Sequence, residues 1–153
     1  MTARFRAAAL LLSLIATAAC AGEQAEEYGF IATLGNDTTS VERIVRTGDR
    51  VVGDAVGRSP LVVRRRWEAT LAPDGTIRRW SMDTHVMNGA PEEQHLHHEA
   101  EFLADRVRLV RATSRDTTDV AYSRKYEVTV PWNAFLYGSW ELLFQAAQGR
   151  PDT

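Results

Sequence analysis

The sequence of 153 residues contains a single cysteine, Cys20, and a single lysine, Lys125. With one thiol the chain cannot form an internal disulfide, so its stability has to come from a packed core. The sequence also lacks a glycine-rich phosphate loop and the G-x-S-x-G turn of serine hydrolases. These absences leave enzymatic activity open but favour a protein without a catalytic role, and no residue suggests a bound cofactor.

A long apolar run occurs only near the N-terminus. Arg4 and Arg6 precede a run that extends from residue 7 to residue 16, and small residues then surround Cys20. A basic start, an apolar stretch and a small-residue exit are typical of a secretory signal, and the run is too short for a comfortable bilayer span. We predict that residues 1–21 are a signal peptide and that the protein is exported, to the periplasm or to a lipid-anchored place in the envelope.

The lone cysteine bears on how that signal is processed. Small residues before Cys20 resemble the lipoprotein box, in which the cysteine receives lipid and becomes the mature N-terminus. Thr17 stands where that box usually has leucine. The alternative is cleavage after small residues such as Ala19 and Ala21, which releases a protein without an anchor. The sequence leaves both open, and Cys20 is the only predicted point of membrane attachment.

The charge and length of the remaining chain limit its possible partners and its number of domains. Without Arg4 and Arg6, 16 basic side chains face 20 acidic ones, and a net charge near −4 argues against nucleic acid as a partner. Residues 22–27 read as an acidic linker. Residues 28–150 then form one domain, long enough for a single core.

Alternation of apolar and polar residues, with frequent turn signals, predicts strands over most of this domain. The fold class is therefore mainly β (α+β): an antiparallel meander of about eight strands, in a curved sheet or half-barrel. The expected strands are 28–34, 39–46, 50–56, 61–71, 76–87, 93–102, 106–112 and 120–130.

The C-terminal part changes to a helical period. Trp140, Leu143, Phe144 and Ala147 share one face of a helix that Ser139 can cap. We predict one amphipathic helix whose apolar face covers the sheet.

The hairpin between residues 76 and 102 has a predictable register. If Met87 opposes Glu93, then His85 faces His95 and Asp83 faces His97, all on one side of two adjacent strands. Imidazoles and a carboxylate are ligands that zinc accepts. Four residues are thus candidate metal ligands: His85, His95, His97 and Asp83. The competing interpretation is a solvated face of ordinary polar contacts.

The preceding turn offers two registers. A three-residue loop that pairs Ala72 with Thr76 would place Trp67 on the histidine face. The apolar pattern instead places Trp67 with Trp80, and a β-bulge at Gly75 would supply the required shift. We favour the apolar pattern, because burial of each large side chain contributes about 1.5–3 kcal/mol.

Three consecutive arginines, 64–66, invite an anion-binding interpretation. Neighbouring residues of a strand point to opposite faces, so Arg65 is directed away from the other two. The sequence therefore contains no three-arginine clamp, and a solvated strand is the simpler expectation.

The mature chain resembles exported bacterial β-sheet domains of unknown function, and also the sheet-plus-helix of LolA-like lipoprotein carriers. The resemblance rests on Leu34-Gly35-Asn36-Asp37-Thr38, on Val41-Glu42-Arg43 and on the tail 131–149. These are turn and strand motifs, so no functional residue is carried over.

Our leading hypothesis is an envelope protein that binds an apolar small molecule or lipid between sheet and helix. An accessory N-terminal domain of a larger secreted hydrolase and a metal-binding protein are the alternatives. The residues that would line the apolar site are Trp67, Trp80, Met82, Phe102, Trp140 and Phe144. The competing interpretation, which we favour, is that these side chains are simply core.

Overall fold

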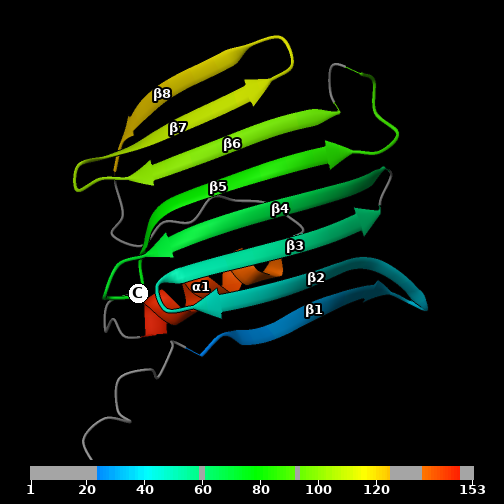
Figure 1. Ribbon diagram of the computed structural model, residues 1–153, viewed down its shortest axis with the longest axis horizontal. Coiled ribbons are helices and arrows are strands. Elements are labelled where there is room, and N and C mark those ends of the chain that lie inside the picture. The colour runs from blue at the N-terminus through cyan, green and yellow to red at the C-terminus, as the bar shows by residue number, and fades with distance from the viewer. Residues whose placement is uncertain (1–23, 59–60, 92–93, 125–135, 149–153) are drawn as a thin grey trace, which may run out of the picture.

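The computed structural model describes residues 24–58, 61–91, 94–124 and 136–148. Within these ranges the chain forms one antiparallel meander of eight strands followed by one helix (Figure 1), which confirms the predicted fold class. The elements are β1 (Glu26–Leu34), β2 (Asp37–Thr47), β3 (Arg50–Arg58), β4 (Val62–Leu71), β5 (Ile77–Val86), β6 (His95–Phe102), β7 (Arg106–Thr113), β8 (Thr117–Ser123) and α1 (Tyr137–Gln148).

Tight turns set the register of the first strands. Leu34 pairs with Asp37 and Thr47 with Arg50, so each hairpin has a two-residue loop. Gly35 and Gly48 open these loops with φ of 62° and 58°. Glycine adopts positive φ without steric cost, and two-residue hairpin loops require it.

The first strand begins inside the segment expected to be a linker. Glu26 pairs with Arg46 across β1 and β2. The Arg43 guanidinium also donates two hydrogen bonds of 2.7 Å to the Glu27 carboxylate. The acidic residues thus extend β1 by pairing with arginines of β2.

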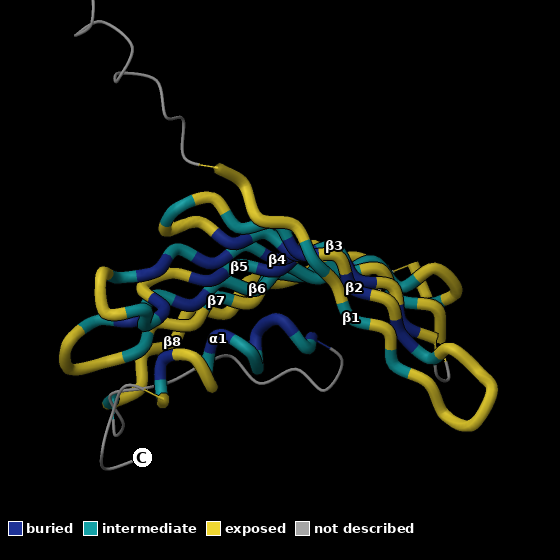
Figure 2. Tube along the Cα trace, turned by 90° about the horizontal axis from the view of Figure 1, so that it is seen from below, coloured by how far each residue is buried: buried dark blue, intermediate teal, exposed yellow. Residues whose placement is uncertain are grey.

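The sheet is arched, and α1 lies on its concave side (Figure 2). We call the side that carries α1 the helix side, and the opposite side the convex side. The core lies on the helix side, because the large apolar residues of the strands alternate toward it. Its strand members are Ile44, Val51, Ala55, Trp67, Ala69, Leu71, Ile77, Trp80, Met82, Ala100 and Phe102.

The β4–β5 register follows the apolar pattern, as we favoured. Trp67 pairs with Met82 and Ala69 with Trp80, so these residues share the helix side. The irregularity that permits this lies between Thr70 and Leu71, not at Gly75. Gly75 instead supplies the turn, with φ of 81°.

The helix contacts the sheet through a different face from the one predicted. Its buried residues are Gly138, Ser139, Leu142 and Ala146. Phe144 is 60% exposed. Ser139 lies inside α1, which begins at Tyr137, so Ser139 does not cap it. The buried face starts with Gly138 because the close approach of its backbone to Ile44 and Trp67 leaves no room for a side chain.

Candidate functional site

The helix covers only part of the concave side. Buried side chains concentrate on β2 to β6, whereas every residue of β8 is exposed. Over β5 to β8 the helix side is hollowed into a groove of about 450 Å³, which we call the helix-side groove. It is lined by Trp80, Met82, His98, Glu99, Ala100, Leu109, Val110, Arg111, Thr118, Val120 and Tyr122.

Cross-strand pairing explains why these residues meet. Trp80, Ala100, Leu109 and Val120 are successive partners across four strands, so they form one apolar row. The next row runs from Met82 through His98 and Arg111 to Thr118. The groove is therefore an apolar surface bordered by an imidazole and a guanidinium, and Leu109, Val120 and Tyr122 remain exposed within it.

Two buried nitrogen atoms of the groove lack hydrogen-bond partners among the described residues. They are the indole Nε1 of Trp80, a residue only 3% exposed, and Nδ1 of His98. A buried polar atom without a partner is costly, and such atoms are rare in folded proteins. Burial, aided by the positive charges of Arg111 and His97, lowers the pKa of His98. The groove thus presents unused polar atoms within an apolar surface.

The six predicted lining residues do not form one site. Trp80 and Met82 line the helix-side groove. Trp67 and Phe102 belong to the core. Trp140 and Phe144 contact each other on α1, with ring centroids 6.4 Å apart, outside its buried face. The predicted site lies under the helix, where Leu136 and Leu142 belong to the same buried cluster as Trp67.

Several lining residues were not predicted, among them Leu109, Arg111, Val120 and Tyr122. Alternation of apolar and polar residues in β7 and β8 was the signal that could have found them. Using it requires the register of two more hairpins beyond the predicted β5–β6 pair. Extension of the register to β8 fails because the predicted last strand begins at residue 120, whereas β8 begins at Thr117.

On the convex side, the predicted β5–β6 register is confirmed. His85 pairs with His95, and Asp83 pairs with His97. The His85 and His95 rings stack with centroids 4.4 Å apart and an interplanar angle of 21°. Nδ1 of His97 lies 2.8 Å from Oδ1 of Asp83.

These four residues form two separate pairs. Among the described residues, no three His, Cys, Asp or Glu side chains form a group that could hold a metal ion. Stacking directs the His85 and His95 rings face to face, and the Asp83 carboxylate is engaged by His97. The described residues therefore provide no group of three ligands for the candidate metal site.

The predicted signal peptide and Cys20 lie outside the described residues. Within the described ranges, no helix is both long and apolar enough to cross a membrane. No family model, no curated protein and no solved structure matches this chain. Its function has to be argued from its own sequence and geometry.

Proposed function

We propose that this is an exported envelope protein that binds an apolar ligand in the helix-side groove. Export rests on the basic, apolar and small-residue pattern of the N-terminal segment. Binding rests on the groove over β5 to β8, whose volume of about 450 Å³ suits a small organic molecule.

One observation carries the proposal: the groove combines exposed apolar side chains with unpartnered buried nitrogens. Leu109, Val120 and Tyr122 are 38%, 37% and 57% exposed on the same hollowed surface. Burial of such side chains by a ligand contributes about 25 cal/mol per Å² of apolar area. The N–H of Trp80 would gain a partner from a ligand that carries a hydrogen-bond acceptor.

The ligand class follows from these two features. It is an elongated apolar molecule with one polar group that accepts hydrogen bonds. The guanidinium of Arg111 lines the same groove and favours a negatively charged group, such as a carboxylate. A fatty acid has this chemistry, and the fluorescent polyene fatty acid cis-parinaric acid is a suitable probe.

The test compares two substitutions of similar exposure on opposite sides of the sheet. Val120 lines the groove, and Val56 is 47% exposed on the convex side. Val120→Asn should weaken binding of cis-parinaric acid by about tenfold, a difference of about 1.4 kcal/mol, because it places a polar amide in the apolar row. Val56→Asn should leave it unchanged.

Mass spectrometry of an organic extract from the native protein would then identify bound molecules. Equal binding by wild type and Val120→Asn, or equal loss in both variants, would contradict the proposal. Circular dichroism of each variant would verify that the sheet is intact.

A further inference from the structure

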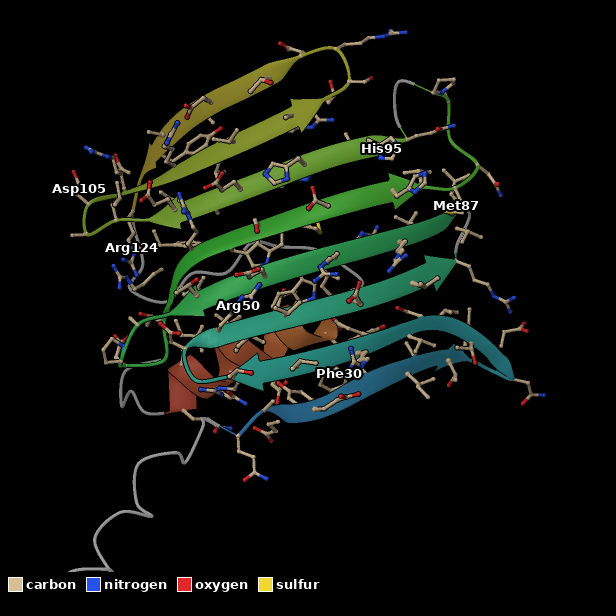
Figure 3. The ribbon with its side chains drawn as sticks, in the orientation of Figure 1. Phe30, Arg50, Met87, His95, Asp105 and Arg124 are labelled. Carbon is tan, nitrogen blue, oxygen red and sulfur yellow. The ribbon has the colours of Figure 1, made fainter. Side chains whose placement is uncertain are left out.

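The convex side carries a second groove, of about 430 Å³, which we call the convex groove. It lies over β4 to β7, toward the end of the sheet where His95 begins β6 (Figure 3). It is lined by Arg64, Arg66, Asp83, Thr84, His85, His95, Leu96, His97, Ala112, Thr113 and Ser114. It is separated from the helix-side groove by the thickness of the sheet.

Its basic residues are arranged by the strand register. Arg64 pairs with His85, and His85 pairs with His95, so the three side chains form a row across the sheet. Arg66 lies two positions along β4, on the same side, and pairs with Asp83. Alternation thus separates Arg65 from this set, as expected, but brings the other two arginines together beside the stacked imidazoles.

The carboxylates near the groove are partly occupied. Nδ1 of His97 contacts Asp83 at 2.8 Å. Nη2 of Arg64 lies 3.6 Å from Oδ1 of Asp54, which is a loose ion pair. No ion pair or hydrogen bond within the described ranges involves the Arg66 guanidinium. Three carboxylates lie near the two guanidinium groups: Asp54 and Asp83, the partners of Arg66 on β3 and β5, and Glu68, whose pKa the charge of Arg66 helps to lower. His97 engages Asp83, and Arg50 donates two hydrogen bonds to Glu68.

We propose that the convex groove binds an oxyanion group, phosphate or sulfate, between Arg64, Arg66 and the His85–His95 pair. Guanidinium groups match the geometry of such anions with paired N–H donors. An imidazole N–H adds a donor, and a protonated imidazole adds charge. The volume of about 430 Å³ lies in the range of small-molecule sites, so the oxyanion is a substituent of an organic molecule.

The stacked histidines make binding depend on pH. Two imidazoles with centroids 4.4 Å apart repel each other when both carry a proton. A bound dianion offsets that repulsion, so binding and protonation favour each other. His97 also lines the groove, but its Nδ1 contacts Asp83, and His98 lies on the helix side. The other charged groups near this row are Asp54, Arg64, Arg66, Glu68 and Asp83.

Sulfate is the appropriate first probe, because it stays doubly charged across the range in which histidines titrate. Calorimetric titrations would be made on the mature protein at low ionic strength, since salt screens exposed charges. Affinity for sulfate should be higher at about pH 5.5 than at about pH 8. His95→Gln should remove most of this difference. Binding of sulfate no stronger than that of chloride would overturn the proposal.

Two arginines provide a charge-matched pair of variants. Arg79 lies on the convex side outside the groove, where its Nη2 is 3.0 Å from Oε1 of Glu99. Arg66→Gln should weaken sulfate binding about tenfold. Arg79→Gln should change it less than about twofold, and Asp83→Asn should strengthen it. Equal losses in the two arginine variants would indicate diffuse attraction and would overturn the site.

A second experiment distinguishes a site for a free phosphate ion from a site for a phosphate group carried by an organic molecule. A sugar phosphate monoester should bind about tenfold more tightly than inorganic phosphate at the same pH. If the two bind equally, the inferred organic substituent is wrong. Neither experiment depends on the helix-side groove, because the neutral substitution Val120→Asn should leave sulfate binding unchanged even where it weakens fatty-acid binding.

Discussion

The buried carboxyl group of Glu42 accepts a hydrogen bond of 2.7 Å from Nε1 of Trp67. Both residues are 1% exposed. The second carboxyl oxygen accepts a hydrogen bond of 3.0 Å from the backbone N–H of Gly138 in the first turn of α1. One side chain of β2 thus links β4 to the start of the helix. An acidic group is favoured there by the unpaired N–H groups and the dipole of a helix N-terminus.

The first prediction concerns the pH dependence of this link. Burial raises the pKa of Glu42, although hydrogen bonds from Gly138, Trp67 and Tyr137 partly oppose the shift. Because this pKa is higher in the folded than in the unfolded state, protonation of Glu42 favours folding. The contribution of the protonated carboxyl group to stability is full below the ordinary glutamate pKa. It is lost as the pH rises through the raised value.

Glu42→Gln removes this titration. The free energy of unfolding of Glu42→Gln should therefore increase relative to that of the wild type as the pH rises. Urea unfolding of both proteins at several pH values would measure it. The lowered pKa values of Glu27, Glu68 and Asp119, caused by hydrogen bonds from arginines, act in the opposite direction but equally in both proteins. A difference that stays constant with pH would contradict the prediction.

The second prediction concerns two glycines on the same side of β3. A Cβ atom on Gly53 would overlap the indole ring of Trp67, whereas a Cβ on Gly57 would meet its nearest atom at 3.8 Å. Gly53→Ala should lower the free energy of unfolding by about 1–3 kcal/mol, the usual cost of overpacking. Gly57→Ala should change it by less than about 0.5 kcal/mol. Similar losses in both variants would show that backbone conformation, rather than contact with Trp67, is responsible.

The third prediction tests which face of α1 holds it to the sheet. Leu142 is 2% exposed and Phe144 is 60% exposed. Leu142→Ala should cost about 2–5 kcal/mol, as buried leucine truncations do. Phe144→Ala should stay within about 0.5 kcal/mol. Thermal and urea unfolding would measure both, and a larger loss for Phe144→Ala would favour the face predicted from sequence.

The accuracy of sequence reasoning differed between elements for physical reasons. The β5–β6 register was predictable because alternation and a short loop both constrain it. Elsewhere, the three-residue loop after Ala72 and the burial of Trp67 call for different registers, and the structure accommodates both. The Ala72 N–H donates a hydrogen bond of 2.7 Å to the Thr76 carbonyl oxygen, and a register shift between Thr70 and Leu71 keeps Trp67 on the helix side. The predicted position of this shift, at Gly75, was wrong.

The helix face was wrong for a different reason. Apolar periodicity selects the side with the largest apolar residues, here Trp140 and Phe144. The structure instead buries the side with Gly138 and Ser139, because only small residues allow α1 to approach Ile44 and Trp67 closely. Likewise, alternation placed residues on the correct sides of the sheet, but the grooves depend on what covers each side. The cover of each side depends on how α1 packs against the sheet, and the periodicity of the sequence does not reveal that packing.

The last prediction concerns export and the fate of Cys20. The basic residues Arg4 and Arg6, the apolar run and the small residues after it predict removal of the N-terminal segment. Intact-mass analysis of the native protein should find a chain that begins at Cys20 with attached lipid, or a chain that begins near Gly22. In the first case, Cys20→Ala should move the protein from the membrane fraction to the soluble fraction, because one diacylated, lipid-bearing cysteine is a stable anchor. In the second case, the same substitution should leave fractionation unchanged. A full-length chain that starts at Met1 and remains in the cytoplasm would refute export in either form.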